Sequence, residues 1–260
     1  MSSPVTGQHL LVSLDGPIAT ITLNRPEKLN ALTLPMLSTL EEALLAIDAD
    51  AHVRVVVITG SGPKAFSAGA DVTAWSSLAP LEMWRTRTRT GHRVMERLES
   101  LRQPTIAALN GLAYGGGLEL ALACDLRIAA DHVKLAAPEV GIATVPGWGM
   151  TTRLATIIGP ARAKQMILTG LPIDAARAAA WGVVSEVVPA DQLDTATDAL
   201  AAHIAAQAPV AVQIAKELID AARPRTSLES LGSGLTAFTD DAREGQAAFG
   251  ERRPPEFGGS

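Results

Sequence analysis

Two glutamates, Glu119 and Glu139, stand beside glycines in otherwise apolar sequence. Their segments are Asn110-Gly-Leu-Ala-Tyr-Gly-Gly-Gly-Leu-Glu119 and Ala137-Pro-Glu139-Val-Gly141. Burying an unpaired carboxylate among apolar residues is costly, and it raises the pKa of the group. Two such carboxylates can hold one water between them, one accepting a proton while the other donates one. The pair therefore predicts acid–base chemistry on water.

Each glutamate also has a structural interpretation. Glu119 could be a capping-box residue in the first turn of a helix, but the residue three positions earlier is Gly116 and not Ser or Thr. Glu139 could stabilise a turn after Pro138. A catalytic role is favoured for the pair more than for either residue alone.

Two glycine-containing segments, residues 64–71 and 114–117, each follow an apolar strand-like run. Glycine lets a ligand approach the main chain, and the start of a helix leaves N–H donors unsatisfied. Two such donors could form an oxyanion hole, although glycine clusters also make plain tight turns. Neither segment is followed by Gly-Lys-Ser/Thr or has the dinucleotide-binding spacing. Nucleotide hydrolysis and NAD binding are therefore disfavoured.

The elements that must position these residues follow from hydrophobic periodicity and turn residues. Asp15-Gly16 predicts a hairpin turn, and Thr33 with Pro35 predicts the start of a helix. Strands are expected at residues 10–14, 18–23, 53–59, 105–109 and 126–130, helices at 80–101 and from 116, and loops at 60–71 and 138–149.

The pattern becomes helical after Val188-Pro189. Helices are expected at residues 200–206, 210–221, 228–238 and toward Arg252, followed by a disordered tail at 254–260. We therefore expect an α/β core over residues 1–190 and a helical region over residues 191–260.

Composition narrows the class of protein. The chain has 260 residues, 47% of them hydrophobic, and a net charge of −5, which disfavours nucleic acid and anionic membranes as partners. Cys124 is the only cysteine, so an intramolecular disulfide and metal–thiolate chemistry are not expected. The sequence has no signal-peptide pattern and no run of ~20 apolar residues. A cytoplasmic protein without a metal or redox cofactor is expected.

With these motifs in order, the sequence resembles the crotonase superfamily, and specifically its enoyl-CoA hydratases, from about Val12 to Phe249. The resemblance rests on Asn24-Arg-Pro26, Asn30-Ala-Leu32, Ala65-Phe-Ser-Ala-Gly-Ala-Asp71, Asn110-Gly111, Gly115-Gly-Gly-Leu-Glu119, Cys124-Asp125, Pro138-Glu139, Pro146-Gly147 and Leu168-Thr-Gly170. It implies a spiral of ββα repeats followed by a helical trimerisation region, assembled as a homotrimer or a dimer of trimers.

The resemblance also implies roles for individual residues. Glu119 would activate water for addition to C3 of a 2-enoyl-CoA, and Glu139 would deliver a proton to C2. The backbone N–H groups of Ala68 and Gly116 would hold the thioester oxygen. The CoA part of the substrate would lie along Lys28 and Leu29 and the loop Ala68, Gly69, Ala70 and Asp71, with Phe249 and Arg252 as weaker candidates. No separate cofactor is implied, because coenzyme A is part of the substrate.

Some features depart from this pattern. Trp148 stands where smaller residues are usual, so it is a candidate for shaping the acyl pocket. The run Arg85-Thr-Arg-Thr-Arg-Thr90 fits a helix poorly and is interpreted as a solvated face, with His92 as a surface residue. Related members with isomerase activity usually replace one or both glutamates, so keeping both favours a hydratase. Isomerisation and non-catalytic acyl-CoA binding remain the alternatives.

Overall fold

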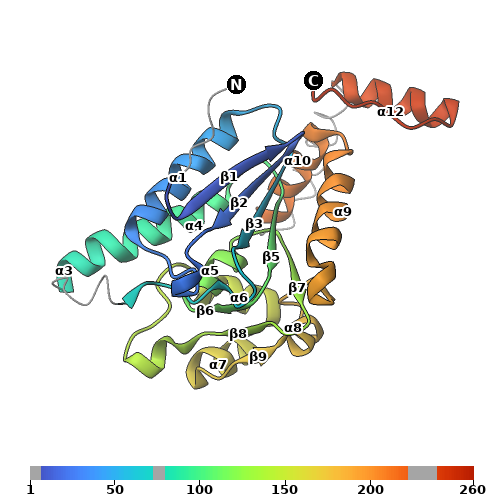
Figure 1. The fold of residues 1–260 in the computed structure, drawn as a ribbon. Helices are drawn as coiled ribbons and strands as arrows, with labels where there is room; N and C mark the ends of the chain where they lie inside the picture. Colours follow the sequence, from blue (N-terminus) through green and yellow to red (C-terminus); the bar gives the residue numbers. More distant parts are fainter. Residues whose placement is uncertain (1–6, 73–79, 222–238) are drawn as a thin grey trace.

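The computed structural model describes residues 7–72, 80–221 and 239–260, in which the strands form two sheets (Figure 1). The larger sheet has the order β1 (Leu10–Asp15), β2 (Ile18–Leu23), β3 (Val55–Gly60), β5 (Thr105–Leu109), β7 (Leu126–Ala130) and β10 (Glu186–Val188). The smaller sheet has the order β4 (Ala65–Ser67), β6 (Leu112–Tyr114), β8 (Lys134–Ala136) and β9 (Ile173–Asp174).

The predicted hairpin and first helix are confirmed. β1 and β2 are antiparallel with Asp15 opposite Ile18, and Gly16 has a φ of 53° in the turn between them. Helix α1 (Leu34–Ala49) begins after Thr33, whose Oγ1 accepts a hydrogen bond from the Met36 N–H at 3.3 Å. This bond satisfies one of the N–H groups that every helix start leaves unpaired.

The ββα repeat is also confirmed. From β2 onward the neighbouring strands of the larger sheet run parallel, and β3, β5 and β7 are each followed by a short strand of the smaller sheet, β4, β6 or β8, before the chain turns helical. The sequence did not reveal these short strands, because three residues are too few for a period-two pattern. The loop expected at 60–71 therefore contains β4, and the glycine segment at 114–117 begins at the last residue of β6.

Most of the remaining helices lie between these strands. They are η1 (Pro26–Lys28), α3 (Pro80–Glu82), η2 (Met83–Thr88), α4 (Arg89–Glu99), α5 (Gly116–Leu122), η3 (Pro138–Ile142), α6 (Met150–Ile158), α7 (Pro160–Thr169), α8 (Ala175–Trp181) and η4 (Ala190–Gln192). The expectation that Arg85 to Thr90 fits a helix poorly is wrong. Most of this run lies in η2, a π-helical segment, and the rest begins α4. π-helical turns interrupt α-helices most often at functional sites.

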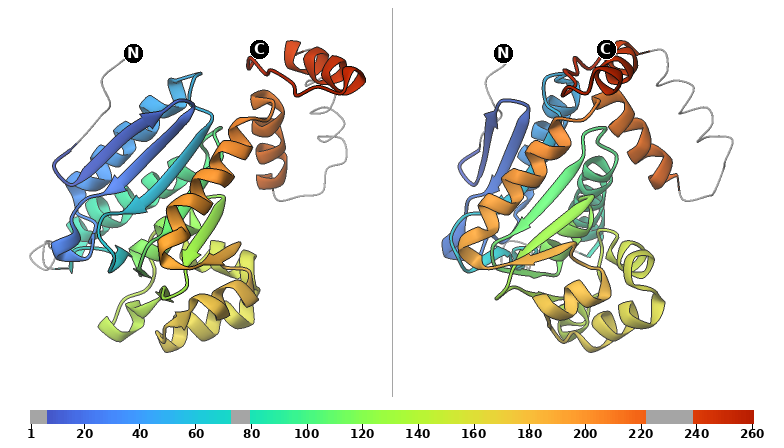
Figure 2. Two further views of the ribbon diagram at one scale, coloured as in Figure 1. Left: turned by 45° about the vertical axis from the view of Figure 1, so that its right-hand side comes forward. Right: turned by 90° about the vertical axis from the view of Figure 1, so that its right-hand side faces the viewer.

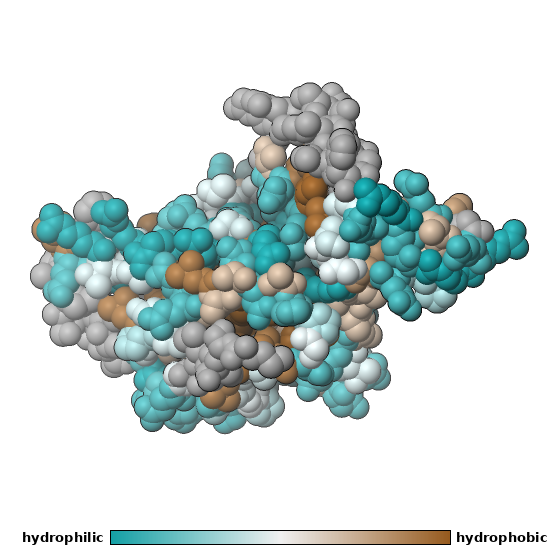
Figure 3. Space-filling model, turned by 90° about the horizontal axis from the view of Figure 1, so that it is seen from above, coloured by the Kyte–Doolittle hydropathy of each residue, from teal (hydrophilic) through white to brown (hydrophobic). Residues whose placement is uncertain are grey.

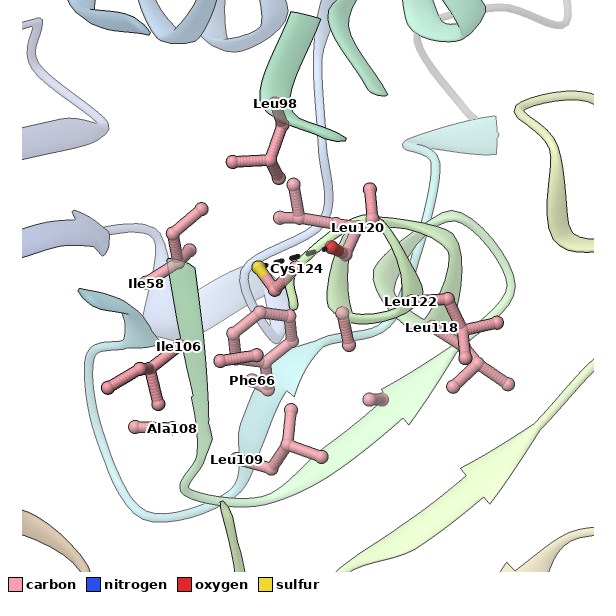
Figure 4. Packing of buried hydrophobic residues seen from close by; sticks show 14 of the residues in the cluster. Ile58, Phe66, Leu98, Ile106, Ala108, Leu109, Leu118, Leu120, Leu122 and Cys124 are labelled. Atoms are coloured by element: carbon pink, nitrogen blue, oxygen red, sulfur yellow. Dashed lines mark hydrogen bonds between the residues drawn. The ribbon is translucent and has the colours of Figure 1, made fainter. Parts of the chain in front are cut away.

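Helix α5 is buried along its whole length, from Gly116 to Leu122. Its leucines belong to the same core cluster as Ile58 of β3, Phe66 of β4 and Ile106 of β5, and Figure 4 shows Leu120 on the side of α5 that faces Phe66. Cys124 follows the helix, and its Sγ donates to the Leu120 carbonyl oxygen at 3.6 Å. Burial raises the pKa of this thiol to about 12, so it is an inert core residue. Close packing of α5 in the core therefore holds its first turn, which carries Glu119, in a fixed position.

After the last strand the chain is helical, in α9 (Leu193–Ala205), α10 (Pro209–Asp220) and α12 (Asp240–Glu251). Helix α9 packs against β3, β5 and β7 of the larger sheet. In α10, Lys216 Nζ contacts the Asp125 carboxylate at 2.8 Å. Helix α12 lies at the edge of the molecule in both views of Figure 2, and its surface in Figure 3 is mostly hydrophilic. Because α9 belongs to the packing of the sheet, a boundary at residue 190 stays a prediction.

Two further expectations concern the C-terminal part. The helix expected at 228–238 lies outside the described residues. The tail expected to be disordered instead makes backbone contacts: the Ser260 carbonyl oxygen accepts from the Asp240 N–H at 2.8 Å, and Arg54 Nη2 donates to the Phe257 carbonyl oxygen at 2.7 Å. Within the described ranges, no helix has the length and apolar character needed to cross a membrane.

Candidate active site

One cavity of about 170 Å³ brings the two glycine segments and both glutamates together. Its described lining comes from the loop after β4, from η2, from the start of α5, from η3 and from the chain between η3 and α6. The residues that line it are Ala68, Gly69, Ala70, Val72, Arg87, Thr88, Gly115, Gly116, Glu119, Pro138, Glu139, Ile142, Thr144, Val145, Gly147 and Trp148.

The loop after β4 offers one backbone donor to this cavity, and it is not the predicted one. The Ala68 N–H donates to the Leu29 carbonyl oxygen at 2.9 Å, so it is occupied within the protein. Ala70 instead forms a parallel bridge with Leu32. The Leu32 N–H donates to the Gly69 carbonyl oxygen, and the Leu32 carbonyl oxygen accepts from the Asp71 N–H. This pattern points the Ala70 N–H away from Leu32, and among the described residues it has no acceptor. The assignment of Ala68 to the oxyanion hole is therefore wrong, and Ala70 is the better candidate.

The Asn24-Arg-Pro26 and Asn30-Ala-Leu32 motifs hold this loop in place. Arg25 Nη1 contacts Asp71 Oδ2 at 2.6 Å, and Asn30 Nδ2 donates to the Ala65 carbonyl oxygen at 2.8 Å. Ser67 Oγ donates to the Asn30 carbonyl oxygen at 2.8 Å and accepts from the Gly69 N–H at 3.1 Å. Buried polar groups of this kind fix a loop because each one needs its partner. The motif residues therefore fix the position of the loop after β4 that carries the Ala70 N–H.

The second candidate donor is the N–H of Gly116, the first residue of α5. A first-turn N–H has no partner inside its helix, and within the described chain no other acceptor reaches it. A Cβ atom on Gly69 would lie 3.0 Å from this nitrogen and 2.7 Å from the Tyr114 carbonyl oxygen, so the two segments approach closely. The N–H groups of Ala70 and Gly116 are thus available on one side of the cavity.

Glu119 is 3% exposed, and its Oε1 accepts from the N–H groups of Trp148 at 2.7 Å and Met150 at 3.3 Å. Burial raises its pKa to about 7, the two N–H groups oppose that rise, and the charge of Glu139 adds to it. A carboxyl group with this pKa is ionised in a large fraction of molecules near neutral pH and can still accept a proton.

Glu139 reaches the same cavity from η3. A Cβ atom on Gly115 would lie 3.1 Å from its Oε1, so the glycine turn and the carboxylate are close neighbours, and the φ of 50° at Gly115 favours glycine. Burial raises the pKa of Glu139, against the effects of its own backbone N–H and of Arg87. Among the described residues, Oε2 of Glu139 is buried without a hydrogen-bond partner. Such an oxygen suits a group that carries a proton to a ligand.

Trp148 is buried at 3% exposure and forms one wall of the cavity. Cβ atoms on Gly91 and Gly116 would lie 2.1 Å and 2.4 Å from atoms of the indole ring. The ring therefore occupies space that side chains on α4 and α5 would otherwise fill. The sequence singled out Trp148 but gave no sign that two glycines make room for it.

The sequence missed Arg87 as a site residue. Arg85 and Arg89 are exposed, as expected for a solvated face, but Arg87 is half-buried and lines the cavity. Burial lowers the pKa of Arg87, and the negative charges of Glu119 and Glu139 oppose that effect. A run of alternating arginines does not reveal which member faces inward, because that depends on the π-helical turn.

The remaining predicted contacts lie beside the cavity. Lys28 is exposed, Leu29 supplies the carbonyl oxygen that holds Ala68, and Asp71 pairs with Arg25. None of the three is part of the described cavity lining, so contact with CoA stays a prediction for them. Phe249 is 88% exposed on α12. His92 is a surface residue as expected, with Nε2 at 3.0 Å from Glu96 Oε1.

This geometry suits the addition of a small molecule to a polarised double bond. Two backbone N–H groups can stabilise negative charge on a carbonyl oxygen, and two carboxyl groups with raised pKa values can exchange protons at neutral pH. Within the described residues, no group of three or more His, Cys, Asp and Glu side chains is arranged to hold a metal ion.

Comparison with known proteins decides the family. The family model described as enoyl-CoA hydratase/isomerase matches residues 14–260. The chain belongs to the enoyl-CoA hydratase/isomerase family. It is 41% identical to a probable enoyl-CoA hydratase of Mycobacterium tuberculosis over 97% of this chain and 99% of that protein. It is 36% identical to a crotonyl-CoA hydratase of Syntrophomonas wolfei over 96% of this chain and 98% of that protein.

Solved structures of the enoyl-CoA hydratase/isomerase family have the same fold. The enoyl-CoA hydratase from Bacillus anthracis matches with a TM-score of 0.94 and 39% identity, covering 97% of this chain and all of that one. The predicted crotonase-like spiral and the predicted family are confirmed together. The chain is a hydro-lyase of the enoyl-CoA hydratase type.

Proposed function

We propose that this enzyme adds water to the C2–C3 double bond of short 2-enoyl-CoA thioesters, with Glu119 and Glu139 as the acid–base pair. One observation carries the residue assignment: two carboxyl groups with raised pKa values face one cavity whose wall also offers the N–H groups of Ala70 and Gly116. The similarity to a relative named crotonyl-CoA hydratase supports a short acyl chain.

The roles of the two glutamates rest on the family resemblance and on their surroundings. The family resemblance gives Glu119 the role of the base. Its pKa of about 7, raised by burial against two backbone N–H bonds, leaves it ionised in a large fraction of molecules near neutral pH, so it takes a proton from water as the oxygen bonds to C3. The π electrons of the C2–C3 bond then move toward the thioester oxygen, which the Ala70 and Gly116 N–H groups stabilise. The electrons return as C2 takes a proton from Glu139, whose Oε2 has no partner among the described residues. The reverse sequence removes water.

Trp148 and Arg87 would set the shape and charge of the acyl end of the cavity. Lys28, Leu29 and Asp71 would lie along the CoA part of the substrate, as the family resemblance implies. No cofactor beyond the CoA of the substrate is required by this chemistry. We also propose that the enzyme is cytoplasmic and that it assembles as a homotrimer or a dimer of trimers. Light scattering of the purified protein would test the oligomeric state.

The direct test is product analysis with crotonyl-CoA and with a 3-enoyl-CoA of equal length. Hydration removes the conjugated-enoyl absorbance of crotonyl-CoA and gives a product heavier by one water. Isomerisation would instead convert the 3-enoyl-CoA into the conjugated isomer with no change in mass. Binding of both thioesters without either reaction would favour a non-catalytic role and contradict the proposal.

A further inference from the structure

A chain of hydrogen bonds connects Glu119 to the end of α4, outside the cavity. The N–H groups of Trp148 and Met150 both donate to Glu119 Oε1. Between them, the Trp148 carbonyl oxygen accepts from Arg153 Nη1 at 2.7 Å. Arg153 Nε and Nη2 then contact the two carboxylate oxygens of Glu99 at 3.0 Å and 2.6 Å. The peptide groups before Trp148, after Trp148 and before Met150 are consecutive. The first and third point their N–H groups toward Glu119, and the second points its carbonyl oxygen toward Arg153.

Gly149 makes this alternation possible. Its φ of 107° lies in the region that other residues rarely adopt, and a Cβ atom there would lie 2.2 Å from Arg153 Nη1. The guanidinium therefore fills the space beside the turn and bonds to the one carbonyl oxygen that faces it.

Arg153 is 9% exposed, so its donors need partners inside the protein. The Trp148 carbonyl oxygen and the Glu99 carboxylate supply three bonds in the planar fork arrangement that arginine makes and lysine cannot. Arg153 is outside the described lining of the cavity, so it acts on substrate only through other groups.

We propose that Arg153, oriented by Glu99, is a positioning residue for hydration: it fixes the turn of residues 148–150, whose N–H groups orient and hold the Glu119 carboxylate. The proposal rests on the role of Glu119 in the proposed function. General-base catalysis depends on the direction of the accepting oxygen, and a displacement of about 1 Å costs on the order of a hundredfold in rate. A turn that holds one carboxylate oxygen leaves the other oriented toward water.

Among the described residues, the charged groups that interact with Glu119 are Glu139, Arg153 and, across the cavity, Arg87. Arg153 and the two N–H groups favour the ionised carboxylate, whereas burial and Glu139 disfavour it. Loosening the turn therefore has a second consequence besides misorientation, namely a further rise in the pKa of Glu119. A residue that only stabilised the fold would not produce it.

The test compares Arg153→Lys and Glu99→Gln with the matched control Arg93→Lys. Arg93 makes a similar two-pronged pair with Glu41, at 2.6 Å and 2.7 Å. It lies on α4, the helix that ends with Glu99, and is not part of the described cavity lining. Each variant is measured for kcat and KM with crotonyl-CoA over a pH series. The pKa of Glu119 is measured separately by infrared difference titration, with Glu119→Gln identifying its carboxyl band, and thermal unfolding checks folding.

We expect Arg153→Lys to lower kcat by roughly 10- to 100-fold while KM changes by less than about threefold. The acidic limb of its kcat profile and the infrared titration of Glu119 should both move to higher pH. Glu99→Gln keeps the arginine and one acceptor, so its loss in kcat should be smaller and in the same direction. Arg93→Lys should leave all three readouts at wild-type values.

The proposal is overturned if Arg153→Lys folds and has the kcat and Glu119 titration of the wild type, or if Arg93→Lys reproduces its effects. If Arg153→Lys fails to fold, the same comparison rests on Glu99→Gln, and an unchanged kcat and titration there would overturn the proposal. The infrared readout needs no turnover. An inactive wild type would contradict the proposed function, while a shifted Glu119 titration in Arg153→Lys would still support the positioning of Glu119.

Discussion

Glu119 and Glu139 face one cavity from separate segments of the chain, where burial raises the pKa of Glu119 to about 7 and the negative charge of Glu139 adds to that rise. The Glu119 carboxylate also accepts two backbone N–H bonds, whereas Oε2 of Glu139 has no partner within the described chain. The proposed roles, with Glu119 as the base and Glu139 as the acid, have measurable consequences.

The first consequence is the pH dependence of the rate. If Glu119 must be ionised to accept a proton from water, kcat should fall as the pH drops below about 7, approaching tenfold per pH unit. Steady-state rates with saturating crotonyl-CoA between pH 5 and pH 9 would show this limb. A limb near pH 4.5 would mean that Glu119 is not the titrating base.

The second consequence is a cost in stability. The pKa of Glu119 in the folded protein, about 7, is above its ordinary value of 4.5, so the folded state holds the proton more tightly than the unfolded state. Stability from this group is full below pH 4.5 and is lost as the pH rises through about 7. Glu119→Gln should therefore be more stable than wild type at pH 8, by up to roughly 3 kcal/mol, with little difference at pH 4.

Urea unfolding of both proteins at the two pH values would measure that difference. Gln at this position keeps an oxygen that can accept the Trp148 and Met150 N–H groups. A variant less stable than wild type at pH 8 would show that the ionised carboxylate is well accommodated.

The third prediction separates the two alanines of the donor loop. Replacing the Ala70 N–H by an ester oxygen removes a donor without an acceptor in the described protein, so stability should change little while kcat falls about a hundredfold. The same replacement at Ala68 removes its bond to Leu29 and should cost about 1 kcal/mol of stability. If the replacement at Ala68 lowered kcat as much as the replacement at Ala70, Ala68 would also be part of the oxyanion hole.

The fourth prediction concerns Arg87. Its positive charge lowers the pKa of Glu139, so Arg87→Gln should raise the pKa of Glu139 and shift the basic limb of the rate profile to higher pH. The exposed Arg85 lies in the same helical segment, and Arg85→Gln is the matched control. An identical shift in both variants would show a general charge effect instead of a specific one.

Local signals in the sequence predicted the first hairpin and the first helix and drew attention to the two glutamates, whereas the ββα spiral was predicted from the resemblance to the crotonase superfamily. Asp15-Gly16, the Thr33 cap and the glycines before Glu119 each act over a few residues. The sequence could not separate Ala68 from Ala70, because the choice depends on Leu29 and Leu32, which lie far away in the chain. Arg87 was missed for a similar reason, since its inward direction is set by a π-helical turn. The support of Glu119 by Arg153 likewise required distances across the fold.

The most direct test of the account is the hydration rate of wild type, Glu119→Gln and Glu139→Gln with crotonyl-CoA, each shown to be folded and to bind the thioester. The account predicts turnover in wild type and a loss of at least about a hundredfold in each variant, because each removes one proton-transfer group. Both losses should appear in kcat with KM nearly unchanged. A variant that keeps its kcat would contradict the two-glutamate mechanism.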